Sequence, residues 1–279
     1  MVPSRRSSKK IITYLALTLA ISSISYYVMI STGSAQSVAL PWMWSPWIAA
    51  IVTQLLFRDG LGEFGWRPGP LRYLILGYAA PWIYGLLIHT VVWVTGLGGF
   101  QARPFVLLGI PMPFVISLVV MCLLGLFPAC GSALGEEIGS RGLLVPELAK
   151  ITTFTRTALL TGIIWAVWHC PGVIFADYHR PAPRPFDLLS ITISVFGMSL
   201  FTAWLRLKTA SIWPAVLWHG NHNLLIQSIL LRMTVDTGVT GYFVDDFGIG
   251  VLLSSLVMGY VFWSKRSDLP NTTIASNSR

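Results

Sequence analysis

The chain has 279 residues, of which 54% are hydrophobic and only 11% are charged. Because soluble domains carry about 25% charged residues, this composition excludes an ordinary soluble protein and is typical of an integral membrane protein. The basic residues that give the formal net charge of +8 lie between apolar stretches. We therefore interpret the charge as attraction to membrane lipids of the cytoplasmic leaflet and predict no binding to nucleic acid.

Eight stretches of the chain meet or approach the roughly 20 apolar residues that a helix needs to span a bilayer. In chain order they are Ile11–Ile30, Val38–Phe57, Leu71–Val94, Phe114–Leu148 (interrupted), Thr157–Ala176, Leu188–Leu207, Ile212–Leu231 and Phe247–Trp263. We predict an all-α, polytopic membrane protein with about eight transmembrane helices. Residues 1–264 would form a single membrane domain, and residues 265–279 a disordered cytoplasmic tail.

The basic residues also predict the orientation of these helices. With the N-terminus inside, 14 of the 19 Lys and Arg residues fall in cytoplasmic segments, four in outer loops, and Arg141 within a span. Since cytoplasmic loops are enriched in Lys and Arg, both termini should be cytoplasmic, in the cell membrane if the source is bacterial. A signal peptide is the alternative interpretation of the N-terminus. The first apolar run is longer than the roughly 7–15 residues of a signal peptide, which favours a retained helix.

Four residues in the spans are interpreted as packing residues. His89, in the third stretch, should be hydrogen-bonded within the helix packing. Cys122, Cys130 and Cys170 also fall in predicted spans, without CxxC spacing. We expect them to be small apolar core residues, and they imply no disulfide framework.

Three charged residues lie inside the fourth stretch, where an ionisable side chain costs several kcal/mol and normally marks a functional site. Glu137 and Arg141 are spaced i,i+4 and can form an ion pair. Glu136 is rotated by about 100° from Glu137, so we expect it to point elsewhere and to remain a free carboxylate. Close helix approach or a local break that admits water would be allowed by the surrounding glycines, Gly131, Gly135, Gly139 and Gly142.

Further polar residues lie in the fifth and seventh stretches. Trp165 and His169 are spaced i,i+4, as are His219 and Asn223, so each pair shares one helix face. His222 is expected to point away from the His219 face and to serve as a packing or supporting residue.

The expected depth of the polar residues in the membrane is separate evidence that they lie close together. Counted at 1.5 Å per residue from basic residues on the cytoplasmic side, Glu136, His169 and His219 lie at depths of about 21, 20 and 17 Å. Three helices that run in alternating directions should therefore bring them to one level.

A carboxylate, imidazoles and a carboxamide around a wet pocket suit water activation. Glu136 could accept the proton of a water that His169 orients, while His219 and Asn223 donate to the oxyanion. Glu136, His169 and His219 could instead bind a divalent metal such as zinc, although no HExxH motif is present. The residue types favour a hydrolase. A proton- or ion-coupled transporter and a structural ion pair with packed histidines are the alternatives.

Three segments resemble the EExxxR, FxxxH and HxxxN motifs of the CAAX protease and bacteriocin-processing family, also called CPBP or Abi. They are Glu136-Glu137-Ile-Gly-Ser-Arg141, Trp165-Ala-Val-Trp-His169 and His219-Gly-Asn-His-Asn223. The resemblance covers about residues 130–230, with Trp165 in place of the usual Phe. It implies an intramembrane endopeptidase, nominally a metalloprotease, whose catalytic core lies at about 114–231 in the fourth to seventh helices.

The resemblance also implies roles for the motif residues. Glu136 would be the base, His169 would assist the water, and His219 with Asn223 would form the oxyanion site. Glu137 and Arg141 would brace the fourth helix. The substrate would be a membrane-associated or lipidated peptide or protein, and an inactive immunity or scaffold member of the family is a further alternative. A metal-free mechanism is favoured over a zinc mechanism, because the neutral carboxamide of Asn223 suits oxyanion binding better than metal ligation.

Overall fold

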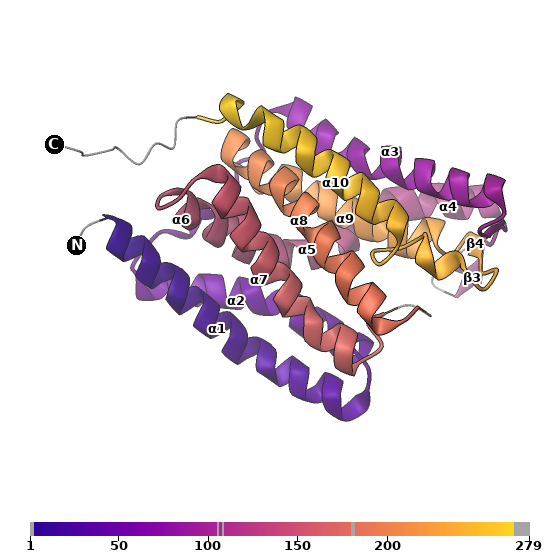
Figure 1. The fold of residues 1–279 in the computed structure, drawn as a ribbon, viewed down its shortest axis with the longest axis horizontal. Coiled ribbons are helices and arrows are strands. Elements are labelled where there is room, and N and C mark those ends of the chain that lie inside the picture. Colours follow the sequence, from indigo (N-terminus) through magenta and orange to yellow (C-terminus); the bar gives the residue numbers. More distant parts are fainter. Residues whose placement is uncertain (1–2, 105, 108, 180–181, 271–279) are drawn as a thin grey trace.

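The computed structural model describes residues 3–104, 106–107, 109–179 and 182–270, and it consists mainly of helices packed side by side (Figure 1). The α-helices are α1 (Pro3–Thr32), α2 (Ala39–Leu56), α3 (Leu71–Thr95), α4 (Phe114–Leu124), α5 (Leu126–Glu137), α6 (Val145–Ala149), α7 (Phe154–Phe175), α8 (Arg184–Thr209), α9 (Trp213–His222) and α10 (Ile249–Ser264). Short 3₁₀ helices are η1 (Gln36–Val38), η2 (Leu61–Phe64), η5 (Thr240–Tyr242) and η6 (Lys265–Asp268). The fold is thus nearly all-α, as predicted.

Four two-residue strands depart from the all-helical prediction. They are β1 (Gly99–Phe100), β2 (Val106–Leu107), β3 (Ile110–Pro111) and β4 (Thr234–Val235). β1 pairs antiparallel with β4, and β2 pairs antiparallel with β3. These small sheets lie in connections between helices, so they leave the helical architecture unchanged.

In the described part of the chain, five helices are long and apolar enough to cross a membrane: Arg5–Thr32, Leu71–Thr95, Phe114–Ala149, Phe154–Phe175 and Arg184–Thr209. The other three predicted stretches correspond to α2, to α9 with its continuation, and to α10. The number of eight spans therefore stays a prediction. Of the predicted disordered tail, Lys265–Asp268 form η6, and residues 271–279 lie outside the described part of the chain.

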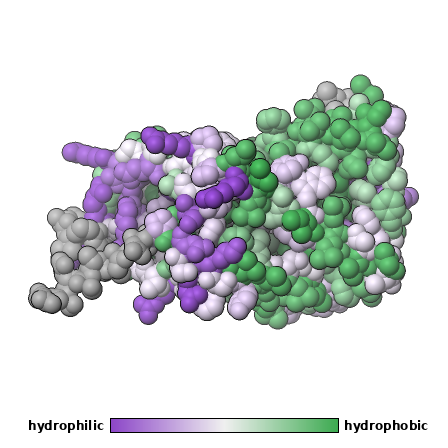
Figure 2. Space-filling view, turned by 90° about the horizontal axis from the view of Figure 1, so that it is seen from above, coloured by the Kyte–Doolittle hydropathy of each residue, from purple (hydrophilic) through white to green (hydrophobic). Residues whose placement is uncertain are grey.

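One end of the molecule carries both the start of α1 and the end of α10 (Figure 1). Hydrophilic residues gather at this end, and apolar residues cover most of the remaining surface in the view of Figure 2. We call this the basic end. It is marked by basic residues at the ends of α1, α6, α7, α8 and α10: Lys9, Lys150, Arg156, Lys208 and Lys265.

An ion-pair network ties α1 into the basic end. The Lys10 ammonium is buried and lies 2.7 Å from an Asp59 carboxylate oxygen and 3.0 Å from a Glu147 carboxylate oxygen. Burial alone would raise the pKa of Asp59, but hydrogen bonds from Arg6 and Lys10 outweigh that effect and lower it. These contacts connect α1 to the segment after α2 and to α6.

Two helices that carry motif residues change to π-helical geometry at the motifs. The π-helix η3 (Ile138–Leu144) continues α5 directly after Glu137, and η4 (Asn223–Leu230) continues α9 directly after His222. Such π-helical segments are rare and occur frequently at functional sites. The interruption predicted in the fourth apolar stretch is therefore present, although α4, α5, η3 and α6 still follow one another closely.

Glycines let α5 and η3 approach their neighbours closely, as predicted. A Cβ on Gly135 would lie 2.6 Å from the Met43 carbonyl oxygen, and one on Gly139 would lie 2.5 Å from the Tyr14 hydroxyl. Gly131, in contrast, faces open space. Side chains at the two crowded positions would push α5 and η3 away from α1 and α2.

Of the residues interpreted as packing residues, His89 is buried as expected, whereas the three cysteines are less buried than core residues. His89 is fully buried, and its Nδ1 lies 2.9 Å from the Gly85 carbonyl oxygen in the same helix. Cys122, Cys130 and Cys170 are free cysteines at half-buried positions.

Candidate active site

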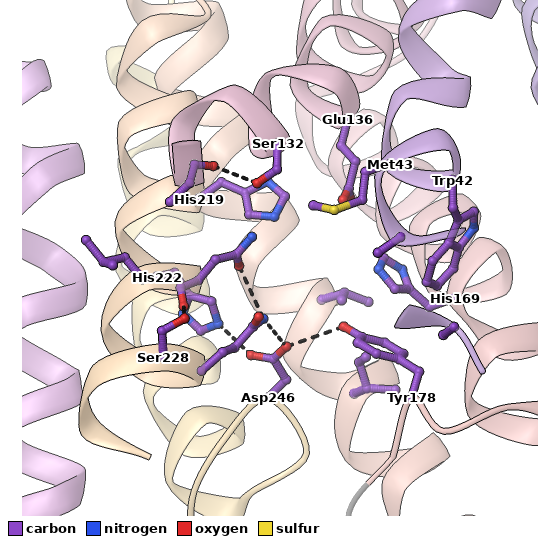
Figure 3. A pocket seen from close by; sticks show the side chains of 18 of the residues that line it. Trp42, Met43, Ser132, Glu136, His169, Tyr178, His219, His222, Ser228 and Asp246 are labelled. Atoms are coloured by element: carbon purple, nitrogen blue, oxygen red, sulfur yellow. Dashed lines mark hydrogen bonds and ion pairs between the residues drawn. The ribbon is translucent and has the colours of Figure 1, made fainter. Parts of the chain in front are cut away.

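A cavity of about 550 Å³ lies among α2, α5, α7, α8 and α9 (Figure 3). Its wall includes Glu136 from α5, His169 from α7, His219 from α9 and Asn223 from η4. The structure therefore brings the four predicted catalytic residues together, while their chemical roles remain predictions. The wall also includes Trp42 and other residues of α2, which lies outside the predicted fourth-to-seventh-helix core.

The predicted ion pair between Glu137 and Arg141 is present and fully buried. Arg141 Nη1 lies 3.1 Å from Glu137 Oε1, and Arg141 also donates to the Thr202 hydroxyl of α8 through Nε at 2.9 Å and through Nη2 at 2.5 Å. Glu137 Oε1 additionally lies 2.9 Å from His219 Nδ1. The pair thus links three helices and holds one of the candidate catalytic imidazoles, which the spacing within one helix did not indicate.

Both candidate imidazoles have Nδ1 bonded to an oxygen acceptor. His219 Nδ1 faces the Glu137 carboxylate, and His169 Nδ1 lies 2.8 Å from the Trp165 carbonyl oxygen. Because these oxygens only accept, Nδ1 of each ring carries the hydrogen. Nε2 of each ring is then an acceptor in the neutral form and a donor in the imidazolium form.

Trp165 lies at the centre of the motif residues. Its indole Nε1 donates to Glu136 Oε2 at 2.9 Å, and its ring centroid lies 4.6 Å from the Arg141 guanidinium carbon. The rings of His169 and His219 lie 5.9 and 5.6 Å from the Trp165 ring. As predicted, Arg141 forms its ion pair with Glu137, but the Glu136 carboxylate has a partner that the prediction did not include, the indole N–H that reaches it from α7. A Phe at this position has no such donor.

Asp246 provides a polar group on the cavity wall opposite Glu136 (Figure 3). Its Oδ1 lies 2.7 Å from His222 Nε2, and its Oδ2 accepts from Gln227 Nε2 at 2.7 Å and from the Tyr178 hydroxyl at 3.4 Å. The Tyr178 ring also stacks on His169 at 5.7 Å. Sequence reasoning missed Tyr178 and Asp246 because both lie outside the predicted spans: Tyr178 follows the fifth apolar stretch, and Asp246 precedes the eighth. The available signal was the pair of acidic residues, Asp245 and Asp246, directly before the eighth stretch.

The position of His222 corrects another expectation. His222 lines the same cavity as His219, and it supports the site by bonding Asp246 and the Tyr84 hydroxyl, the latter at 2.5 Å. Residues three apart on a helix differ by about 300°, which is only about 60° short of a full turn. His222 therefore stays near the His219 face and does not point away from it.

Gln227 orients the Asn223 carboxamide. Gln227 Nε2 donates to Asp246 and also to Asn223 Oδ1, the latter at 3.3 Å. Since the Asp246 carboxylate only accepts, the group that Gln227 presents to it is the amino group. The atom of Asn223 that faces this amino group must therefore be the carbonyl oxygen Oδ1, which accepts the hydrogen bond. This orientation leaves the Asn223 amino group available to donate to another partner.

The predicted metal ligands do not form a metal-binding group. Within the described residues, no three His, Cys, Asp or Glu side chains converge as ligands of one ion would. Glu136, His169 and His219 share the cavity wall without such convergence, and Glu136 is engaged by the Trp165 indole. The arrangement does not fit a three-ligand zinc site, so the mechanism below uses side chains alone.

Comparison with protein families identifies the segment that carries the motifs. The family described as Type II CAAX prenyl endopeptidase Rce1-like matches residues 113–225, a range that contains all three motifs. No curated protein sequence matches the chain. The match confirms the resemblance inferred from the motifs. Together with the five apolar helices, it indicates an integral membrane protein related to a family of peptidases.

Proposed function

From the match of residues 113–225 to a peptidase family, we propose that the protein is an intramembrane endopeptidase that hydrolyses a peptide bond of a membrane-presented substrate. One observation carries the proposal. Glu136, His169, His219 and Asn223, which occupy the motif positions, line a single cavity of about 550 Å³. That volume lies within the roughly 300–1,000 Å³ typical of small-molecule sites and is large enough for a short peptide segment and a water molecule.

In the proposed mechanism, Glu136 accepts the proton of a water molecule that His169 Nε2 helps to orient. Trp165 holds Glu136 Oε2, so Oε1 faces the water. The water attacks the scissile carbonyl, and the carboxyl group then returns the proton to the leaving amine. General acid–base catalysis of this kind contributes about 10²–10⁴-fold to rate.

The oxyanion that forms is stabilised by Asn223 and His219. Asn223 donates through the amino group that its bond to Gln227 leaves available. His219 donates through Nε2 in its doubly protonated form, which places a positive charge beside the Glu137 carboxylate. Preorganised donors of this type stabilise a transition state by about 2.7–4 kcal/mol each.

The proposal is tested in two steps. Comparison of membranes that contain wild-type or Glu136→Gln protein should identify substrates by new C-terminal peptide ends that only the wild type produces. The purified protein in liposomes should then cleave such a substrate without an ion gradient. Gradient-dependent uptake without cleavage would establish the transporter alternative. Identical peptide ends in both membranes would indicate an inactive family member.

The Trp165 hydrogen bond gives a specific prediction. Trp165→Phe should lower kcat by about 10- to 150-fold and leave KM unchanged, because a hydrogen bond to a charged group contributes about 1.5–3 kcal/mol and 1.4 kcal/mol corresponds to about tenfold in rate. The matched control is Trp168→Phe, which removes an indole bond to Ser22 and none to Glu136. Steady-state kinetics on both variants decide the point. Equal kcat for Trp165→Phe and the control would show that this bond does not position Glu136.

Asn223 and its supporting carboxylate give a graded pair of variants. Asn223→Ala should lower kcat about 10²–10³-fold through the loss of one oxyanion donor. Asp246→Asn lets the Gln227 amide turn over, so it should lower kcat about tenfold, or 1.4 kcal/mol, with KM preserved. Asp236→Asn, at an exposed position in the same connection, is the control and should match the wild type. An Asn223→Ala enzyme with wild-type kcat would remove Asn223 from the oxyanion site.

Metal dependence is tested directly. We expect turnover to persist after chelation, because the proposed water activation and oxyanion binding use Glu136, Asn223 and two imidazoles. The measurement is the cleavage rate of chelator-treated protein alongside its metal content by mass spectrometry. Loss of activity on chelation with recovery on addition of zinc would establish a metal mechanism in place of the proposed one.

A further inference from the structure

We infer that the cavity opens on the membrane face opposite the basic end, so that the substrate is a peptide segment presented on the extracytoplasmic side. The nature of the substrate rests on the proposed peptidase function. The direction of the opening rests on the arrangement of the helices alone.

The mouth of the cavity is formed by exposed polar residues at the far ends of three helices. Among the lining residues, the polar side chains of Gln36, Asp177 and Ser228 are exposed, as is Pro128 of α5. Gln36 follows α1, Asp177 follows α7, and Ser228 lies near the end of η4. α1 and α7 begin at the basic end, and η4 continues α9, which begins there at Trp213. The far ends of these helices therefore place the three polar residues at the opposite end of the molecule.

Helix length places the mouth a membrane thickness away from the basic end. α1 has 30 residues and α7 has 22, which at 1.5 Å per residue correspond to about 45 and 33 Å. The hydrocarbon core of a bilayer is about 30 Å thick. A helix that starts in one interface therefore ends in or beyond the other, and Gln36 and Asp177 lie there.

Asp177 connects two of the loops beside the mouth. Its carboxylate accepts hydrogen bonds from the Ala35 backbone N–H at 2.6 Å and from the Ser34 hydroxyl at 3.0 Å. Burial alone would raise the pKa of Asp177, but these hydrogen bonds outweigh it and lower the pKa. The connection from α1 to α2 is thus held against the connection from α7 to α8 beside the opening.

The distribution of charge assigns the two ends to the two sides of the membrane. Of the 17 Lys and Arg residues that the structure describes, 13 fall in segments at the basic end, and an excess of Lys and Arg marks the cytoplasmic side of a membrane protein. The opposite end, with the mouth, then faces outward. A cytosolic protein lipidated at its C-terminus lies in the cytoplasmic leaflet and would approach the closed end. The outer segment of a membrane protein, or an exported membrane-bound peptide, would approach the mouth.

Thiol labelling tests the orientation without any need for activity. In a background with Cys122, Cys130 and Cys170 replaced by Ser, one cysteine is introduced at the mouth as Ser228→Cys and another at the basic end as Ser267→Cys. A membrane-impermeant maleimide is added to intact cells and then to permeabilised cells. We expect Ser228→Cys to be labelled in intact cells and Ser267→Cys only after permeabilisation. The reverse pattern, or labelling of both only after permeabilisation, would overturn the inference.

A second mouth position keeps the test decisive if Ser228→Cys proves unreactive in every condition. Ser37→Cys lies on η1 beside Gln36 and is exposed, so it should be labelled in intact cells. Its labelling only after permeabilisation would overturn the inference as well. Because labelling reports orientation alone, an outward mouth in a protein that cleaves nothing would contradict the proposed peptidase function and leave the orientation intact.

Discussion

Glu136→Gln is expected to lower kcat/KM by about two to four orders of magnitude, the range that general acid–base catalysis contributes, with no change in the thermal midpoint of unfolding. The Gln side chain keeps the shape of Glu136 and retains a carbonyl oxygen that can accept from the Trp165 indole. It cannot accept the proton of a water molecule. The variant therefore removes the proposed base and preserves the packing around it.

The measurement combines cleavage kinetics with a thermal melt of the purified protein. Glu63→Gln is the matched control, because Glu63 is a largely exposed carboxylate in η2, outside the cavity wall. It should retain wild-type activity and stability. Two results would contradict the assignment of Glu136: cleavage at the wild-type rate, or a fall in the thermal midpoint large enough to account for the loss of activity.

Glu137→Gln and Arg141→Ala are expected to destabilise the protein by about 3–5 kcal/mol each, since removing one partner of a buried ion pair leaves an uncompensated charge. Both side chains have no exposed surface. Arg141→Ala also leaves the Thr202 hydroxyl without its donor and removes the cation from the face of Trp165. The expected readout is a lower thermal midpoint for both variants, together with lower activity.

A double variant separates the charge effect from the loss of contacts. Glu137→Gln combined with Arg141→Ala removes both charges, so the loss of stability in the double variant should be smaller than the sum of the two single losses, as at coupled sites. Activity should remain low, because the carboxylate beside His219 Nδ1 is still missing. Full additivity of the two single losses, or unchanged midpoints in all variants, would refute the bracing role.

The sequence determined the helical class and the location of the chemistry. An apolar run of about 20 residues has few ways to satisfy its backbone in a membrane other than a helix, so a helix stands at each of the eight predicted stretches. Ionisable groups are too costly to retain in such runs without a function, which singled out Glu136, Glu137 and Arg141. The ion pair between Glu137 and Arg141 followed from local spacing alone, because both side chains project from consecutive turns of one helix.

Tertiary structure alone decided which groups meet between helices. The bond between His219 and Glu137 spans 82 residues of chain, and the bond between Trp165 and Glu136 spans 29. Such contacts depend on how each helix is rotated and tilted against its neighbours, which residue periodicity within one helix does not specify. The π-helical turns after Glu137 and His222 shift that rotation further. For the same reason, Asp246 on the cavity wall and the opening of the cavity at one end of the molecule followed only from the packed structure.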